Sequence, residues 1–228
     1  MAIIVNGVNI PTNGDFIKVR NTNIDKVICN GVVVWERMKD IDILAALCSG
    51  TLSYISYDGP DRLSGIDDDG EEVNIDVAHT GGYSTVDLYV GVDSNFIKMR
   101  HYTHGAHDVS IDSSKNGANY LEFTYNLSSY NKLDFSGIKV ADTSIGADTR
   151  GNFCISIDNV VKSNVYQADS HNDEESGNYQ ETDFSESIDV SSYTGIHTIR
   201  LNYNYYSTAQ AGHNTSAQIT INKLQLLS

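Results

Sequence analysis

The segment Asp67-Asp68-Asp69-Gly70-Glu71-Glu72 places five carboxylates within six residues, around a glycine that lets the backbone turn. Carboxylate oxygens at alternating positions, here Asp67, Asp69 and Glu71, are the hard ligands that suit Ca²⁺. A full EF-hand loop is excluded, because no glutamate stands at position 12 of a loop that starts at Asp67. A solvated acidic turn is the simpler interpretation. Structural Ca²⁺ is therefore a candidate, and no other cofactor is expected.

A second group combines aromatic rings with side-chain amides. Tyr203, Tyr205 and Tyr206 are interleaved with Asn202 and Asn204, in a chain with 14 tyrosines and one tryptophan. Aromatic rings stack on sugar faces while amides bind hydroxyl groups, so this cluster is a candidate ligand site. Alternating tyrosines also fill the core and edges of a β-sandwich, and this structural interpretation is favoured.

Two further polar segments are candidates for recognition. His101, His104 and His107 recur every third residue, with Asp108 beside the last. In a strand or loop this spacing points the rings in different directions, so a metal site within one chain is disfavoured. One histidine per chain could complete a shared site around a trimer axis, but exposed loop histidines are the favoured interpretation. Residues 169–178 are predicted to form a long surface loop, a common place for recognition.

Catalysis finds little support in the sequence. No nucleophile elbow, zinc-protease motif, phosphate-binding loop or dinucleotide fingerprint occurs. A glycosidase needs two facing carboxylates, but no pair among the 30 acidic residues is marked by an apolar, aromatic setting. The protein is therefore expected not to be an enzyme.

The elements that position these residues are strands. From Thr51 onwards apolar side chains recur with period two, and Gly, Asn, Asp and Ser turns separate the runs. Ile219 and Ile221 share one face, but Leu224 and Leu226 have the opposite parity, so a bulge near Asn222 is predicted. About nine or ten short strands favour an all-β fold, a jelly-roll sandwich of two sheets.

The first fifty residues differ from the rest. Asn6-Gly7 and Asn30-Gly31 each stand between β-branched runs, which predicts two hairpins within residues 1–36 with Trp35 as an apolar anchor. Ile41, Leu44, Ala45 and Cys48 have the spacing of one helical face. We therefore expect a hairpin attachment module at 1–36, a helical connector at 37–49 and the sandwich at 50–228.

Charge and cysteine content limit the classes of binding partner and indicate the compartment in which the protein is made. Fifteen basic against thirty acidic residues give a formal charge of −15, which disfavours nucleic acid and anionic membranes. No stretch of the sequence has the pattern of a signal peptide or of a membrane-spanning helix. Cys29, Cys48 and Cys154 lack metal-ligand spacing and are expected to be reduced thiols, as in a protein made in a cytoplasm.

Two segments resemble known proteins. Asp25-Lys26-Val27-Ile28-Cys29-Asn30-Gly31-Val32-Val33-Val34-Trp35-Glu36 resembles a "K-V-x-V-N-G-x-x-V-W-E" hairpin of bacteriophage tail and fibre proteins, with Cys29 in place of the usual β-branched residue. The stretch 120–135, the "V-S-S-Y" step at 190–193 and the closing strand 217–224 are similar to galactose-binding-like and carbohydrate-binding-module-like jelly rolls. Such jelly rolls are often appended to phage tail proteins.

These resemblances imply a phage virion structural protein, a tail, fibre or receptor-binding component assembled in the bacterial host cytoplasm. Its N-terminal module would attach to other virion proteins, and its sandwich would adhere to a host-surface glycan through many weak contacts. A homo-oligomer, with a trimer favoured, is expected from that role. One alternative is a capsid or tail decoration or connector that binds only virion proteins, and a second is a polysaccharide-degrading tail enzyme.

Overall fold

A computed structural model describes the backbone of most of the chain, in ranges separated by short gaps. Side chains are described within residues 26, 39–57, 88–103, 119–143, 148–170, 179–207 and 214–228. The backbone is described at residues 3–5, 8–10, 17–19, 22–24, 26–29, 32–36, 39–57, 62–67, 72–77, 84–105, 109–112, 119–143, 147–172, 178–209 and 213–228.

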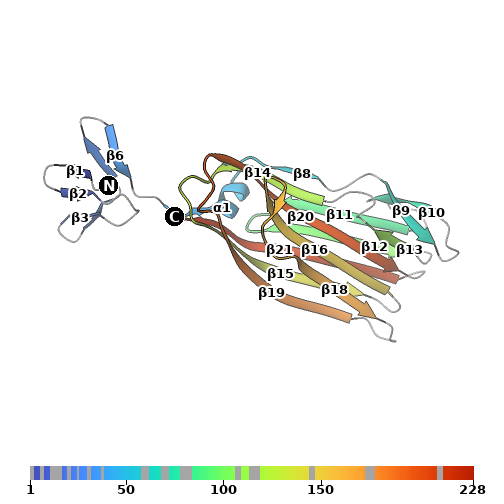
Figure 1. Cartoon of the computed structure of the whole chain (residues 1–228). Helices are drawn as coiled ribbons and strands as arrows, with labels where there is room; N and C mark the ends of the chain where they lie inside the picture. The colour runs from blue at the N-terminus through green and yellow to red at the C-terminus, as the bar shows by residue number, and fades with distance from the viewer. Residues whose placement is uncertain are drawn as a thin grey trace.

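The N-terminal strands form three small antiparallel hairpins (Figure 1). The two that flank Asn6-Gly7 and Asn30-Gly31 are the predicted ones. A third hairpin, around Arg20-Asn21, was not predicted because its sequence there has no glycine. The strands are β1 (Ile3–Val5) with β2 (Val8–Ile10), β3 (Ile17–Val19) with β4 (Thr22–Ile24), and β5 (Lys26–Cys29) with β6 (Val32–Glu36). The side chain of Trp35 lies outside the described residues.

One short helix, α1 (Ile43–Cys48), follows and confirms the predicted helix, although it is only six residues long. The Asp42 carboxylate caps it by accepting a 2.9 Å hydrogen bond from the Ala45 amide. Its buried face consists of Ile43, Leu44 and Leu47, so the predicted face was partly wrong and Ala45 is exposed. The reason is that the first residues of the predicted helix instead form β7 (Ile41–Asp42), which pairs with β21. Among the described residues no helix is long and apolar enough to cross a bilayer.

Two antiparallel sheets pack face to face and form the sandwich (Figure 1). The first sheet has the order β8 (Ile55–Tyr57), β14 (Asn119–Asn126), β20 (Ile196–Ala209), β16 (Ala147–Ile157), β18 (Tyr166–Asn172). The second has the order β11 (Ser84–Val92), β12 (Ile97–Gly105), β21 (His213–Leu227), β15 (Lys132–Thr143), β19 (Asn178–Asp189). Short strands β13 (Val109–Asp112), β9 (Arg62–Asp67) and β10 (Glu72–Val77) link β20 to β11, and β17 (Val160–Val161) pairs with β16. The predicted all-β sandwich with small N-terminal hairpins is confirmed.

The core lies between the two sheets and follows the predicted alternation. The buried apolar side chains come from every second residue of the central strands, and α1 covers one end of them. Large members from the first sheet are Leu121, Phe123, Phe153, Ile155, Ile157, Ile199, Leu201, Tyr203 and Tyr205, and from the second sheet Leu88, Val90, Ile97, Met99, Leu133, Phe135, Phe184, Ile219, Ile221, Leu224 and Leu226.

The bulge predicted near Asn222 is present. Ser136 of β15 pairs with Lys223, but the next residue, Gly137, pairs with Ile221, so Asn222 is left over. The extra residue restores the register and allows both the Ile219–Ile221 pair and the Leu224–Leu226 pair to face the core.

Several strands are longer than expected, and this shortens the predicted loop at 169–178. Strand β18 continues to Asn172 and β19 begins at Asn178, so only residues 173–177 lie outside the described part of this segment. Strands β20 and β21 reach 14 and 15 residues.

Cys48 and Cys154 are free thiols, as predicted, and burial raises the pKa of the Cys154 thiol.

Candidate functional site

The outward face of the first sheet gathers amide, tyrosine and charged side chains on neighbouring strands. Because Leu121 and Leu201 point into the core, their chain neighbours point outwards. Strand pairing sets Tyr57, Tyr120 and Asn202 in one row across β8, β14 and β20. We call the following set the amide face: Tyr57, Tyr120, Glu122, Arg150, Asn152, Gln167, Asp169, Arg200, Asn202, Asn204 and Tyr206.

One end of the amide face is built from two tyrosines and an ion pair. The Tyr57 and Tyr120 rings lie 5.6 Å apart, and the Arg200 guanidinium lies 4.4 Å from the centre of the Tyr120 ring. Arg200 also donates from two nitrogens to a single oxygen of Glu122, with Nη2 and Nε at 2.6 and 2.7 Å from Oε2. Guanidinium stacking and ion pairing restrict the arginine, so its remaining N–H groups are held in place.

The middle of the amide face carries side-chain amides. Asn204, Asn152 and Gln167 stand in one row across β20, β16 and β18. Asn202 lies beside them, and its amide nitrogen donates to Ser156 Oγ at 3.0 Å. A side-chain amide has both a donor and an acceptor, but Asn152 Oδ1 is buried without a hydrogen-bond partner. Asn204 and Gln167 are therefore the members of this row that can offer both groups to the hydroxyl groups of a ligand.

The other end combines Tyr206 with an exposed pair of opposite charges. Tyr206 of β20 stands opposite Arg150 of β16, which stands opposite Asp169 of β18. The Arg150 and Asp169 side chains are 3.6 Å apart and are 49% and 42% exposed. A pair this exposed contributes little to stability and is accessible to a ligand.

The predicted cluster at 202–206 is therefore divided between two environments. Asn202, Asn204 and Tyr206 lie on the amide face, whereas Tyr203 and Tyr205 are 0% and 3% exposed and point into the core. The two buried rings cannot stack on a ligand. Their shared parity with Ile199 and Leu201 already indicated this, because alternate residues of a strand share a face.

Buried Tyr203 belongs to a hydrogen-bonded chain that crosses the core. Its hydroxyl donates to the Ala217 carbonyl at 2.7 Å and lies 3.0 Å from His101 Nδ1, while His101 Nε2 lies 2.9 Å from Thr149 Oγ1. Since the Tyr203 proton is used on Ala217, His101 must donate from Nδ1 and accept from Thr149 at Nε2. Burial lowers the pKa of His101 to about 3, so the ring is neutral.

The other sequence candidates for chemistry have different outcomes. The interpretation of His101 as an exposed loop residue was wrong, because it is fully buried in β12, and the side chains of His104 and His107 are outside the described residues. Of the three residues predicted to bind Ca²⁺, Asp69 and Glu71 lie outside the described residues, and only the backbone of Asp67 is described, as the last position of β9. The calcium site therefore stays a prediction. Within the described residues no group of three His, Cys, Asp or Glu side chains could hold a metal ion.

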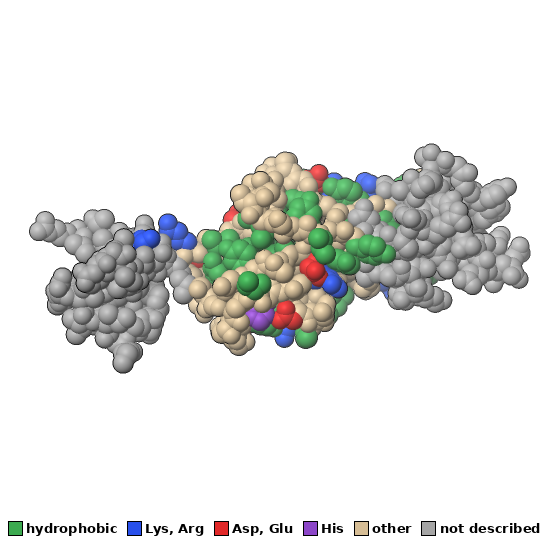
Figure 2. Space-filling model, turned by 90° about the horizontal axis from the view of Figure 1, so that it is seen from above, with side chains coloured by type: hydrophobic (Ala, Val, Ile, Leu, Met, Phe, Trp, Pro, Cys, Tyr) green, Lys and Arg blue, Asp and Glu red, His purple; other side chains and the backbone are tan. Residues whose placement is uncertain are grey.

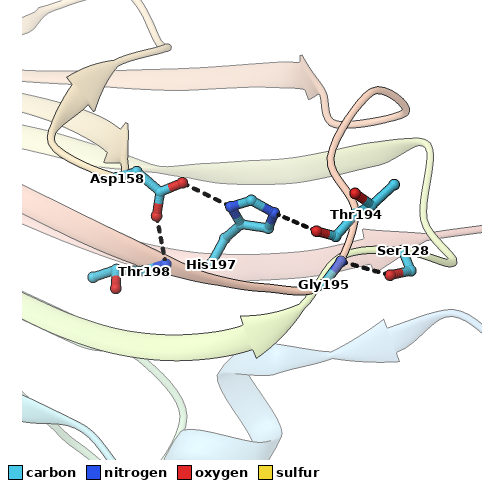
Figure 3. Close-up of polar contacts among 6 residues, drawn as sticks. All are labelled: Ser128, Asp158, Thr194, Gly195, His197 and Thr198. Carbon is cyan, nitrogen blue, oxygen red and sulfur yellow. Dashed lines mark hydrogen bonds and ion pairs between the residues drawn. The ribbon is translucent and has the colours of Figure 1, made fainter.

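An acid–histidine pair lies near the start of β20, away from the predicted sites (Figure 3). His197 Nδ1 is 2.7 Å from Asp158 Oδ2 and Nε2 is 3.1 Å from the Thr194 carbonyl. Both partners are acceptors, so both ring nitrogens carry protons, and the hydrogen bond to Asp158 raises the pKa of His197. Ser128 Oγ accepts a bond from the Gly195 amide at 2.7 Å. This arrangement ties a turn to a loop and holds no activated nucleophile.

The exposed surface of the described sandwich is not uniformly acidic. Figure 2 shows one side on which hydrophobic side chains cover more of the described surface than charged ones. Exposed large apolar residues include Ile55 at 56% and Ile196 at 74%. Such a surface is compatible with binding a neutral partner.

Comparisons with known proteins give distant structural likenesses. No protein-family profile and no curated protein match the chain. A carbohydrate-binding module of family 28, specific for non-crystalline cellulose, matches with a TM-score of 0.28 and 10% identity over 63% of this chain and 80% of its own. A family 11 carbohydrate-binding module from Clostridium thermocellum, in complex with a mixed-linked tetrasaccharide, matches with a TM-score of 0.20 and 12% identity. This match covers 73% of this chain and 96% of that module.

A third match is an isomalto-dextranase from Arthrobacter globiformis complexed with panose. Its TM-score is 0.21 at 9% identity, covering 77% of this chain and 32% of that enzyme. TM-scores this low carry no functional information. The assignment of a sandwich depends on the strand pairing of this chain itself.

Proposed function

We propose that this protein is a non-enzymatic glycan-binding protein and that the amide face is its binding surface. The observation that carries the proposal is the set of side-chain amides, three tyrosines and a fixed Arg200–Glu122 pair on one sheet face. Planar amides and a guanidinium recognise pairs of hydroxyl groups, and tyrosine rings supply rigid apolar contact.

The face suits an extended, neutral saccharide lying across the strands. Tyr57, 40% exposed, offers a ring on which one sugar unit can stack. Asn204 and Gln167 can then bind hydroxyl groups of the neighbouring units. Because β-strands hold these side chains in fixed rows, little conformational entropy is lost on binding.

The biological setting that we propose is a bacteriophage tail or fibre. The support is the resemblance of residues 25–36 to a phage tail hairpin. In that setting the hairpins attach the protein to the virion, and several copies present their amide faces to a host glycan. A trimer is the oligomer we favour, because weak single contacts then gain strength through effective concentration.

Affinity electrophoresis and calorimetry with a panel of neutral bacterial and plant polysaccharides test the binding. We expect Tyr57→Ala and Asn204→Ala each to weaken binding about 10-fold or more. Tyr179→Ala is the matched control, because Tyr179 is 61% exposed on β19 of the other sheet. Equal binding by all three variants, or shortening of the polysaccharide during incubation, would contradict the proposal.

A second candidate function is a connector that binds only virion proteins. The observation that favours it is a group of exposed apolar residues, with Val160, Val161 and Val165 at 55%, 54% and 61%. Exposed aliphatic side chains gain more from a protein interface than from a sugar. If Val160→Ser abolished incorporation into virions while every polysaccharide in the panel failed to bind, the connector function would replace the first proposal.

A further inference from the structure

A polar pocket lies beside the bulge at Asn222, on the second sheet. A pocket of about 350 Å³ lies where β15, β19 and β21 meet. It is lined by Ser136, Gly137, Asp183, Phe184, Ser185 and Asn222. Its volume is at the lower end of the roughly 300–1,000 Å³ that small-molecule sites occupy, which suits a ligand of one or two rings.

Local hydrogen bonding fixes the groups that this pocket presents. Ser136 Oγ donates to Asn222 Oδ1 at 3.0 Å, so the Asn222 amide is oriented with its NH₂ group as the remaining donor. Asp183 and Ser185 are exposed on β19 and add a carboxylate and a hydroxyl. Gly137 lets β15 and β21 approach closely beside the pocket, because a Cβ atom there would lie 2.1 Å from the Thr220 carbonyl oxygen and 2.9 Å from the Phe184 ring.

The lining of the pocket selects the class of ligand. It contains no lysine or arginine, so a phosphate or a carboxylate would meet the Asp183 charge without compensation. It contains one carboxylate only, whereas a protein site for Ca²⁺ requires six or more oxygen ligands, usually including several carboxylates. A neutral polyol matches the mixture of one acceptor-only group, two hydroxyls and one amide. We propose that this pocket binds a single neutral sugar residue, at a site separate from the amide face.

A ¹⁵N NMR titration of the full chain with the methyl glycosides of glucose, galactose and N-acetylglucosamine tests this site. We expect at least one glycoside to shift the amide signals of Gly137, Phe184 and Ser185 with millimolar affinity. Asp183→Ala and Ser185→Ala should each reduce that affinity 5-fold or more. Glu181→Ala is the matched control, because Glu181 is exposed on the same strand but does not line the pocket.

The result is independent of the amide face, since Tyr57→Ala should leave these shifts unchanged. If Tyr57→Ala abolishes polysaccharide binding while the shifts persist, both sites exist. If the polysaccharides fail to bind but the shifts persist, only the pocket proposal stands. The pocket proposal is overturned if no glycoside shifts these amides, if the two pocket variants titrate like Glu181→Ala, or if CaCl₂ alone produces the shifts.

Discussion

Asn202 and Tyr203 are adjacent in the chain but lie on opposite sides of the first sheet. Asn202 faces outwards on the amide face, and Tyr203 is fully buried and hydrogen-bonded through the core. The difference follows from strand geometry, because successive side chains point to opposite faces. At the residue scale, the parity of a position relative to Ile199 and Leu201 therefore decides whether its side chain lies on the amide face or in the core.

The buried chain of hydrogen bonds predicts a large effect at His101. We expect His101→Ala to lower the free energy of unfolding by about 2–4 kcal/mol, because it leaves a cavity and removes the partner of Thr149. Urea denaturation followed by circular dichroism measures this. His197→Ala is the control, since His197 lies near the surface and should matter less. Equal losses in the two variants would contradict the structural role of His101.

The same residue predicts a pH dependence of stability. Burial lowers the pKa of His101 to about 3, from an ordinary value of 6.5 in the unfolded chain. Between these values the unfolded chain binds the proton and the folded chain does not, so the contribution of the neutral ring is complete above pH 6.5 and declines as the pH falls towards 3. We expect the stability difference between the wild type and His101→Gln to shrink between pH 7 and pH 4. A difference that stays constant over this range would show that His101 does not titrate in this way.

At the element scale, strand identity and the bulge could be predicted from the sequence, but strand lengths could not. The change of parity between Ile221 and Leu224 was enough to locate the bulge near Asn222. By contrast, residues 169–172 and 178 read as a polar loop, yet they belong to β18 and β19. Polar residues extend these strands because backbone pairing with β16 and β15 outweighs their weak intrinsic β-propensity.

The bulge also predicts which glycine cannot be replaced. Gly137→Ala would bring a Cβ atom to 2.1 Å from the Thr220 carbonyl oxygen, a contact that backbone atoms can relieve only by moving. We expect a loss of about 3 kcal/mol or more, or an insoluble protein, measured by thermal denaturation and soluble yield. Gly50→Ala is the control, because its φ of +73° is strained for alanine but its Cβ meets no atom within 4 Å. It should cost about 1 kcal/mol. A Gly137→Ala variant as stable as Gly50→Ala would disprove the close approach.

At the scale of the whole molecule, the fold class could be predicted because the period of two persists through most of the chain. The amide face could be predicted only in part. Tyr57, Tyr120 and Arg200 join Asn202 through strand pairing between residues far apart in the sequence, and single-sequence periodicity contains no information about that pairing. The sequence did indicate that Tyr120 and Glu122 face outwards, because they alternate with the apolar residues Leu121 and Phe123, which are buried.

If the amide face binds glycans as we propose, the overall charge predicts which kind of glycan it prefers. With a formal charge of −15, the chain repels anionic polysaccharides at long range, and this repulsion is screened as the ionic strength rises. In the function that we propose, the amide face recognises hydroxyl groups, and such contacts depend little on salt. We therefore expect the Kd for a neutral polysaccharide to change less than about 2-fold between 20 and 500 mM NaCl. Over this range the Debye length shortens several-fold, so an effect of long-range charge would be visible as a change in Kd. An anionic polysaccharide of similar length should bind weakly at low salt, and its affinity should not fall further as the salt concentration rises.

Calorimetry at both salt concentrations measures these affinities. Arg150→Gln, which removes an exposed cation from the amide face, provides the matched variant. Tight binding of the anionic polymer that is lost as salt increases would show that Arg150 and Arg200 form an anion site, and would replace the neutral glycan as the ligand of this face.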